Sequence, residues 1–206
     1  MNTNITVQTL QRLPRYLNYL KTLQRETNIS ATLIGEALGI NAVVVRKDLD
    51  MVSDGGRPKT GYAIQALIDD VEKVLGYDSI NNAVLVGVGR LGDALLSYNG
   101  FADYGFNIIA GFDIDESVVG KEVNGKRILP LKKLNEICQS LKVRIGIITV
   151  PAPAAQSVCD ELVKSGVSAI WNFAPTHLNV PEGILVQNEN MATSLAMLSR
   201  HLNGYQ

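Results

Sequence analysis

Three glycines at the spacing G-x-G-x-x-G constrain the fold of this chain more than any other feature. An apolar run, Ala83–Val86, leads into Gly87-Val88-Gly89-Arg90-Leu91-Gly92, and a helix-like segment follows. In a strand–turn–helix unit the first glycine makes the turn, the second lets a pyrophosphate approach the backbone, and the third allows close packing of helix on strand. Phosphates then bind the N–H groups at the positive end of the helix. The motif predicts an α/β dinucleotide-binding unit with residues 87–92 at the cofactor.

A second apolar run, 106–112, ends at Asp113, twenty-one residues after Gly92. Dinucleotide folds place at this offset the carboxylate that holds the adenosine ribose hydroxyls, and its charge repels a 2′-phosphate. The pattern therefore predicts NAD⁺ and NADH as cofactors in preference to the NADP forms. Asp115 competes for the ribose role, and Asp113 is favoured because it directly follows the apolar run. The alternatives are an empty Rossmann-like scaffold, another nucleotide-type ligand, or solvated loop acids.

The rest of this part of the chain alternates between strands and helices. We expect a short excursion at 125–130, a helix at 131–141, a buried strand at 143–150, a helix at 154–165, and strands at 168–173 and 183–187. Open α/β sheets bind ligands beyond the carboxyl ends of their strands. Thr149 and Pro151 are therefore expected to flank the nicotinamide half of the cofactor. Residues 172–175 lie at the carboxyl end of the strand expected at 168–173. The alternative role of Thr149, Pro151 and residues 172–175 is simply to end their strands.

The N-terminal third has a different character. Residues 1–62 carry eight Lys and Arg residues and five acidic residues, whereas residues 63–206 carry eleven Lys and Arg residues and fifteen acidic ones. Ser30 can cap a short helix that Gly39 stops, and Asn41 can cap another over 42–51. Two short helices with a glycine between them form a helix-turn-helix candidate. This pattern fits a nucleic-acid-binding module attached to a ligand-binding one, although a charge imbalance of this size also arises by chance.

The second helix of this pair is expected to lie in the major groove, with Val45 and Leu49 facing the core and Arg46 free to read guanine edges. Residues 53–62 are too rich in glycine for a helix, and their flanks can form a short hairpin, a wing that follows the DNA backbone. The alternative is a small helical cap with solvated charges. The candidate DNA-binding residues are Asn41, Val44, Arg46, Lys47, Arg57 and Lys59.

Helices flank the pair on both sides. Leucines at intervals of three and four predict a helix over 9–26, in which Pro14 is tolerated only in about the first turn. A linker helix over 63–75 closes at Gly76. The expected organisation is therefore a winged-helix DNA-binding domain with linker helix at 1–76, a Rossmann NAD(H)-binding domain at 77–189, and a closing helix at 190–206.

Composition excludes several classes of protein. No apolar run approaches the roughly 20 residues that span a bilayer, and the N-terminus lacks the basic and apolar regions of a signal peptide. We therefore expect a cytoplasmic protein without a membrane partner. Cys138 and Cys159 lie in helix-like segments without a C-x-x-C motif or a nearby histidine. Buried reduced thiols are favoured over a disulfide, a metal site or a nucleophile.

Several segments together resemble the Rex family of bacterial redox-sensing transcriptional repressors over nearly the whole chain: V-R-K-D-L at 45–49, G-Y at 61–62, G-V-G-R-L-G at 87–92, F-D-I-D at 112–115 and N-F-A-P at 172–175. The resemblance implies a homodimer with an N-terminal winged helix, a Rossmann domain and a last helix swapped into the partner. It further implies binding to palindromic operators, release by NADH and competition by NAD⁺. Carried over by position, the resemblance implies that Arg46 and Lys47 contact DNA and that Arg57 and Lys59 belong to the wing. It implies that residues 87–92 bind the pyrophosphate and that Asp113 binds the ribose. Tyr98 falls where the family has a tyrosine linked to the conformational switch, and its alternative role is a capping aromatic at the end of the helix.

The chain departs from the family pattern at two places. The family wing usually reads F-G-x-x-G-x-G-Y, whereas Gly55 stands here in place of the aromatic and Pro58-Lys59 stiffens the turn, so the operator preference is expected to differ. A pair of charges commonly joins the first helix to the last one across the dimer. The matching positions are Asn18 and Asn190, both neutral. An amide pair can still hydrogen-bond, but the resemblance does not imply the strength of the NADH response.

An NAD-dependent oxidoreductase is the main rival interpretation. It needs a proton-transferring residue near the nicotinamide, and the only histidines are His177, near the carboxyl end of the sheet, and His201 on the closing helix. A nucleotide-binding regulatory subunit that acts only through protein partners leaves Arg46 and Lys47 unexplained. We therefore expect a DNA-binding repressor and not an enzyme.

Overall fold

The computed structural model describes residues 5–23, 27–77, 81–190, 192–193 and 199. The chain divides into two compact units, Met1–Ser79 and Ile80–Gln206, and each is described by itself. Among the described helices, none is long and apolar enough to cross a membrane.

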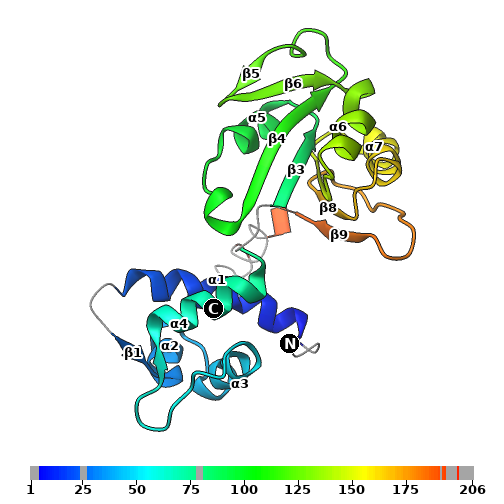
Figure 1. The fold of residues 1–206 in the computed structure, drawn as a ribbon. Coiled ribbons are helices and arrows are strands. Elements are labelled where there is room, and N and C mark those ends of the chain that lie inside the picture. The colour runs from blue at the N-terminus through cyan, green and yellow to red at the C-terminus, as the bar shows by residue number, and fades with distance from the viewer. Residues whose placement is uncertain (1–4, 24–26, 78–80, 191, 194–198, 200–206) are drawn as a thin grey trace. The chain divides into compact units, whose positions relative to one another are not determined.

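The N-terminal unit is built mainly from helices (Figure 1). Its buried side chains form one apolar core. Its elements are α1 (Val7–Thr22), β1 (Asn28–Ile29), α2 (Ala31–Leu38), α3 (Ala42–Val52), β2 (Tyr62–Ala63) and α4 (Ile64–Leu75). Leu13, Tyr16, Ile34, Val45 and Leu49 are completely buried in this core. α2 and α3 form the expected helix-turn-helix, and these side chains pack the two helices against α1.

The predicted caps of the helix-turn-helix are confirmed. The Ser30 side chain accepts a hydrogen bond from the Leu33 N–H at the start of α2 (3.2 Å), and Asn41 accepts one from the Val43 N–H at the start of α3 (2.9 Å). Gly39 ends α2 in the left-handed conformation (φ 65°), which glycine adopts without steric cost. Gly76 ends α4 in the same way, as predicted.

The prediction for the first helix is wrong at its start and at Pro14. α1 begins at Val7 because the Thr6 side chain caps it, accepting a hydrogen bond from the Thr9 N–H at 3.2 Å. Pro14 therefore lies in the helix interior, where it costs about 3 kcal/mol in lost hydrogen bonding and crowding. Full burial of the neighbouring Leu13 and Leu17 offsets this cost. α1 ends at Thr22, and the expected end at residue 26 lies outside the described residues.

The expected hairpin at 53–62 is smaller than predicted. Arg57 and Gly61 form a single bridge through two backbone hydrogen bonds of 2.9 Å, with Lys59 at φ 68° between them. β2, which follows this bridge, does not pair with the residues just before the turn. It pairs antiparallel with β1, which precedes α2 in the sequence. Sequence periodicity does not detect a two-residue strand so far from its partner, so the pattern of residues gives no sign of this pairing.

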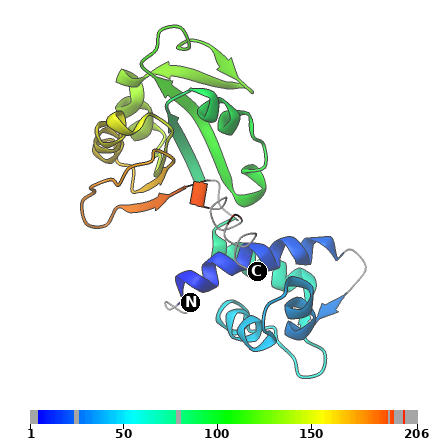
Figure 2. The ribbon, with the colours of Figure 1, turned by 180° about the vertical axis from the view of Figure 1, so that it is seen from behind.

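The second unit is a parallel sheet with helices on both faces (Figure 1 and Figure 2). Its strand order is β5-β6-β4-β3-β7-β8-β9, with β5 antiparallel at the edge. Without β5, this is the 3-2-1-4-5-6 order of the dinucleotide-binding Rossmann fold. The elements are β3 (Asn81–Val86), α5 (Arg90–Ser97), η1 (Ala102–Tyr104), β4 (Phe106–Asp113), β5 (Glu122–Val123), β6 (Lys126–Pro130), η2 (Leu131–Lys133), α6 (Leu134–Ser140), β7 (Ile145–Ile148), α7 (Ala152–Lys164), β8 (Ala169–Asn172) and β9 (Leu185–Asn188).

Alternate residues of the central strand β3 enter two separate cores. Val84 and Val86 face α6 and α7, whereas Ala83 and Leu85 face α5. Cys138 and Cys159 are buried free thiols, as expected. Burial raises the pKa of Cys138 to about 11 and also raises the pKa of Cys159, so both stay protonated at neutral pH.

Three predictions for this unit need correction or lie beyond what is described. The short excursion at 125–130 is in fact β6, a parallel strand paired with β4; its polar start, Lys126-Arg127, hid the strand pattern. The predicted helix at 131–141 begins as the 3-10 turn η2 before α6. Of the closing helix expected over 190–206, only residues 190, 192, 193 and 199 are described, so its swap into a partner lies outside the described residues.

Candidate functional site

The glycine turn joins three strands at their carboxyl ends. Gly87 adopts φ +100°, and a Cβ there would lie 2.7 Å from Val150 Cγ1 and 2.9 Å from the Val150 nitrogen. The Gly87 N–H donates to the Phe112 carbonyl at 2.8 Å. The turn is thus packed between the ends of β4 and β7, and only glycine fits at its first position.

The other two glycines face different surroundings. A Cβ on Gly92 would lie 2.1 Å from the Gly87 carbonyl oxygen, so this glycine lets α5 pack directly on the turn. Gly89 is the N-cap residue of α5, and a Cβ there would meet nothing within 4 Å. The open space beside Gly89, at the positive end of α5, fits a pyrophosphate. Val88 is buried, whereas Arg90 is exposed and Leu91 is half-buried.

Asp113 connects the end of β4 to the glycine turn. Its Oδ2 accepts a hydrogen bond from the Val88 N–H at 2.6 Å, and its Oδ1 accepts from the Ile114 and Asp115 N–H groups at 2.7 and 2.9 Å. An ionised carboxylate offers about four acceptor positions, so capacity for a ribose hydroxyl is left. These contacts place the carboxylate beside the second residue of the turn.

Asp115 lies in a different setting. Its Oδ1 accepts from the Ser117 N–H at 2.8 Å, and the side chain is exposed. Hydrogen bonds from the Ser117 side chain and backbone lower the pKa of Asp115. Asp115 therefore closes its own loop, and the assignment of the ribose to Asp113 or Asp115 stays a prediction.

Thr149 and Pro151 follow β7 and lie at the same edge of the sheet. The Thr149 hydroxyl is 2.6 Å from the Gly87 carbonyl oxygen and 3.1 Å from that of Val86. Thr149 therefore fastens β7 to the glycine turn through its side chain. Pro151 is the exposed N-cap residue of α7. Their contact with a nicotinamide stays a prediction.

Asn172, at the end of β8, has the strand-ending role that was the alternative interpretation. This side chain is completely buried. Its Nδ2 donates to the Ala174 and Thr176 carbonyls and to Asn188 Oδ1, and its Oδ1 accepts from the Ala174 N–H. Asn172 thus shapes the loop that follows β8 and ties it to β9.

Tyr98, the predicted switch residue, begins a row of aromatic rings. It is 55% exposed, and its ring meets Phe101 edge-on with centroids 4.9 Å apart. Phe101 lies 5.9 Å from Trp171, which lies 4.6 Å from Phe173. This row leads from the end of α5 to β8. Tyr98 is also the C-cap residue of α5, which is its alternative role, and its part in the conformational switch stays a prediction.

The other two predicted switch residues lie in different units. Asn18 is exposed on α1, and Asn190 is exposed beyond β9. Asn190 Oδ1 accepts from the Ala192 and Thr193 N–H groups at 3.1 and 3.3 Å. Asn190 therefore caps the start of the next segment. Pairing between Asn18 and Asn190 stays a prediction.

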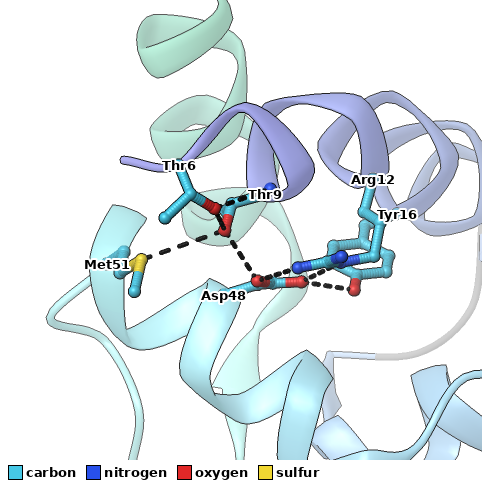
Figure 3. Close-up of polar contacts among 6 residues, drawn as sticks. All are labelled: Thr6, Thr9, Arg12, Tyr16, Asp48 and Met51. Atoms are coloured by element: carbon cyan, nitrogen blue, oxygen red, sulfur yellow. Dashed lines mark hydrogen bonds and ion pairs between the residues drawn. The ribbon is translucent and has the colours of Figure 1, made fainter. Parts of the chain in front are cut away.

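The N-terminal unit contains a buried polar cluster around Asp48 (Figure 3). Asp48 lies on α3 and is 2% exposed. Its carboxylate accepts two hydrogen bonds from Arg12, at 2.6 Å from Nε and 2.8 Å from Nη2, one from the Tyr16 hydroxyl at 2.7 Å, and one from the Thr9 hydroxyl at 2.9 Å. All three donors come from α1. The cluster therefore fixes α3 against α1 at the residue directly after Lys47.

This cluster shifts the protonation of its members. Burial by itself raises the pKa of Asp48, but the hydrogen bonds that it accepts outweigh burial and hold the pKa below its ordinary value of 3.8. Burial, and then the hydrogen bond to Asp48, raise the pKa of Tyr16 to about 12. The hydrogen bond to Asp48 also raises the pKa of Arg12. Asp48 is thus a charged carboxylate at neutral pH, paired with a charged guanidinium.

The predicted DNA-binding cations are all exposed. Arg46, Arg57, Pro58 and Lys59 line a cleft of about 430 Å³ between α3 and the 57–61 turn, and Lys47 is exposed on α3. Asp50 lies in the same cleft, where it accepts the Tyr62 hydroxyl at 2.9 Å. Burial, and then this hydrogen bond, raise the pKa of Tyr62 to about 12. The cleft therefore brings Arg46 of α3 together with Arg57 and Lys59 of the turn.

The remaining candidates, Asn41 and Val44, lie at the start of α3. Asn41 uses its side-chain oxygen to cap the helix. Val44 is 36% exposed, whereas Val43, which is not among the predicted DNA-binding residues, is 56% exposed. Helical periodicity places Val43 on the face of α3 opposite the buried Val45 and Leu49, so the sequence pattern itself indicates that Val43 is exposed.

Two family comparisons match the two units. Residues 4–50 match a family described as putative DNA-binding protein N-terminus, and residues 78–176 match the CoA binding domain family. The redox-sensing transcriptional repressor Rex of Porphyromonas gingivalis is 40% identical over 200 residues, which are 96% of this chain and 92% of the relative. The Rex protein of Carboxydothermus hydrogenoformans is 42% identical over 193 residues, 93% of each chain.

Solved structures give the same result. The crystal structure of RSP in complex with beta-NAD⁺ and operator DNA matches with a TM-score of 0.92 at 32% identity, over 98% of this chain and 94% of that one. The structure of RSP with beta-NADH matches with a TM-score of 0.87 at 32% identity, over 98% of this chain and 96% of that one. RSP is described as a Rex-family repressor. This chain therefore belongs to the Rex family of redox-sensing transcriptional repressors.

Proposed function

We propose that this chain is a homodimeric repressor that binds palindromic operator DNA and releases it when NADH occupies the glycine-turn site. One observation carries the proposal: a chain similar to Rex repressors over almost its whole length has both an open glycine turn at 87–92 and exposed Arg46 and Lys47 on a helix-turn-helix. Structures of the related RSP with operator DNA, NAD⁺ and NADH support both ligands. A repressor works where the operators are, which implies a cytoplasmic location.

The coupling between the two ligands follows from linkage. NADH releases DNA only if it binds the DNA-incompetent arrangement of the two subunits more tightly than the competent one. A shift from mostly bound to mostly free takes a difference of roughly 5 kcal/mol in binding free energy. In a symmetric dimer, two α3 helices would meet the two halves of a palindrome. The Gly89 backbone would hold the pyrophosphate and Asp113 the ribose, whereas the nicotinamide end would alter the subunit arrangement.

The decisive experiment is a titration of operator binding with each nucleotide separately. The duplex is one that the protein itself selects from a pool of random DNA sequences. We expect NADH to release the duplex and an excess of NAD⁺ to oppose that release. Identical effects of the two nucleotides would contradict redox sensing, and no duplex enriched above background would contradict DNA binding.

The oxidoreductase alternative rests on one described histidine. His177 is exposed in the loop after β8, and His201 lies outside the described residues. The relatives from Porphyromonas gingivalis and Carboxydothermus hydrogenoformans are redox-sensing transcriptional repressors, and we propose that this chain acts as a repressor without enzymatic turnover. Sustained oxidation of NADH with a carbonyl substrate would overturn this part of the proposal.

We expect Arg46→Ala to weaken operator binding by about 1–3 kcal/mol, because an arginine in the major groove reads a guanine edge through two hydrogen bonds. Binding to an unrelated duplex should change far less. Both affinities can be measured by fluorescence anisotropy at one fixed salt concentration. Lys132→Ala, which removes an exposed cation from the second unit, serves as the control. An equal loss on both duplexes would make Arg46 a phosphate contact instead.

We expect Asp113→Asn to weaken NADH binding at least about tenfold, because a hydrogen bond to a charged group contributes about 1.5–3 kcal/mol and the amide group also disturbs the bond to the Val88 N–H. A titration of NADH fluorescence measures the loss, and operator binding without NADH should be unchanged. Asp115→Asn is the matched control. If that variant loses NADH affinity and Asp113→Asn does not, Asp115 holds the ribose.

A further inference from the structure

The face of α3 opposite its buried residues carries one apolar side chain, Val43, close to the basic residues Arg46 and Lys47. Val45, Asp48 and Leu49 of α3 are buried. At about 100° per residue, the stripe opposite them contains Val43, Lys47 and Asp50, which all belong to the exposed residues. Val43 is 56% exposed, the largest exposed fraction of any large hydrophobic residue on α3. The outermost residue of the first turn is therefore apolar.

The charges around Val43 indicate what could cover it. Lys47 lies one turn further along the same stripe, and the exposed Arg46 stands beside it. Asp50, another turn along, is a carboxylate held by the Tyr62 hydroxyl, and it would repel phosphate. The favourable surface is thus confined to the first two turns, with an apolar group flanked by cations. This is the part of a recognition helix that enters the major groove.

The major groove offers one apolar feature, the 5-methyl group of thymine, which small apolar side chains contact. We propose that Val43 contacts a thymine 5-methyl group in each half of the operator and so helps to determine which sequence is bound. This inference rests on the proposed DNA binding by α3. It differs from the contacts assigned to Arg46 and Lys47, because no hydrogen bond and no charge is involved.

The test removes the methyl group from the DNA and the side chain from the protein. In the selected operator duplex, each thymine is replaced in turn by deoxyuridine, symmetrically in the two halves, which changes only the 5-methyl group. We expect wild-type binding to fall about fourfold per half-site at one position, since a buried methylene-sized group contributes about 0.8 kcal/mol. Val43→Ala should bind the thymine duplex correspondingly less well and lose nothing more with deoxyuridine at that position.

Leu33→Ala is the matched variant, because Leu33 is another exposed apolar residue of the helix-turn-helix but lies on α2. It should keep the sensitivity to deoxyuridine at the position read by Val43. The proposal is overturned if no deoxyuridine substitution weakens wild-type binding, or if Val43→Ala keeps the full sensitivity. Either result would leave DNA binding itself intact. Failure of the wild type to bind any duplex would instead overturn the proposed function together with this inference.

Discussion

Asp48→Asn is expected to lower the free energy of unfolding of the N-terminal unit by about 3 kcal/mol. Removing one member of a buried ion pair leaves the other without compensation, which costs about 3–5 kcal/mol; the lower value applies because the Arg12 side chain is 27% exposed. The new amide also places N–H groups against donors from Arg12, Tyr16 or Thr9. Urea denaturation of the full chain, followed by circular dichroism, measures the change.

The same substitution should abolish operator binding and spare the binding of NADH. Asp48 holds α3 on α1, so its loss changes the placement of Arg46 and Lys47, whereas the glycine turn lies in the other unit. Glu36→Gln, which neutralises an exposed acid on α2, is the control and should change stability by less than about 0.5 kcal/mol. Equal stability of the two variants would show that the buried cluster does not stabilise the helix pair.

The pH dependence of this difference has a definite sign. Because the pKa of Asp48 is below 3.8 in the folded protein, its contribution is fully present above the ordinary pKa and is lost as the pH falls through the lowered value. The stability advantage of the wild type over Asp48→Asn should therefore be constant between about pH 5 and 8, a range that begins about one unit above the ordinary aspartate pKa. It should shrink as the pH is lowered below about 4.

Features that depend on near neighbours in the sequence could be predicted. Ser30 and Asn41 cap the starts of α2 and α3, and Gly39 ends α2. Each of these roles depends on backbone groups within one helical turn, so the sequence predicts it. The spacing of the glycine turn is equally local, and the obstacle to a Cβ at Gly92 is the Gly87 carbonyl oxygen of the same motif. The parallel sheet follows from the alternation of strands and helices after this turn.

Features that depend on distant partners could not be predicted. Asp48 finds its donors 32 to 39 residues away, and in the sequence it is only one more charge beside Arg46 and Lys47. β1 and β2 pair across the whole helix-turn-helix, and β6 is a strand only because β4 lies beside it. Thr149 is expected near the nicotinamide from its place after a strand, but the contact that its hydroxyl makes is with the carbonyl of the glycine turn.

Gly92→Ala and Gly89→Ala are expected to separate the folding role of the glycine turn from its binding role. A methyl group on Gly92 would lie 2.1 Å from the Gly87 carbonyl oxygen and 3.1 Å from Leu85 Cδ2. α5 must then move away from the turn, with a cost of about 1–3 kcal/mol, as for overpacked cores. We expect this variant to lose stability and NADH binding together.

Gly89→Ala should behave differently. Its φ of −79° suits alanine, and the new methyl group would meet nothing within 4 Å, so thermal unfolding should match the wild type. A pyrophosphate against this backbone would meet the methyl group, and NADH affinity should fall at least about tenfold, which is about 1.4 kcal/mol. Wild-type NADH affinity in Gly89→Ala would show that the pyrophosphate does not lie on this turn, and the coupling of NADH to DNA release would then need another site.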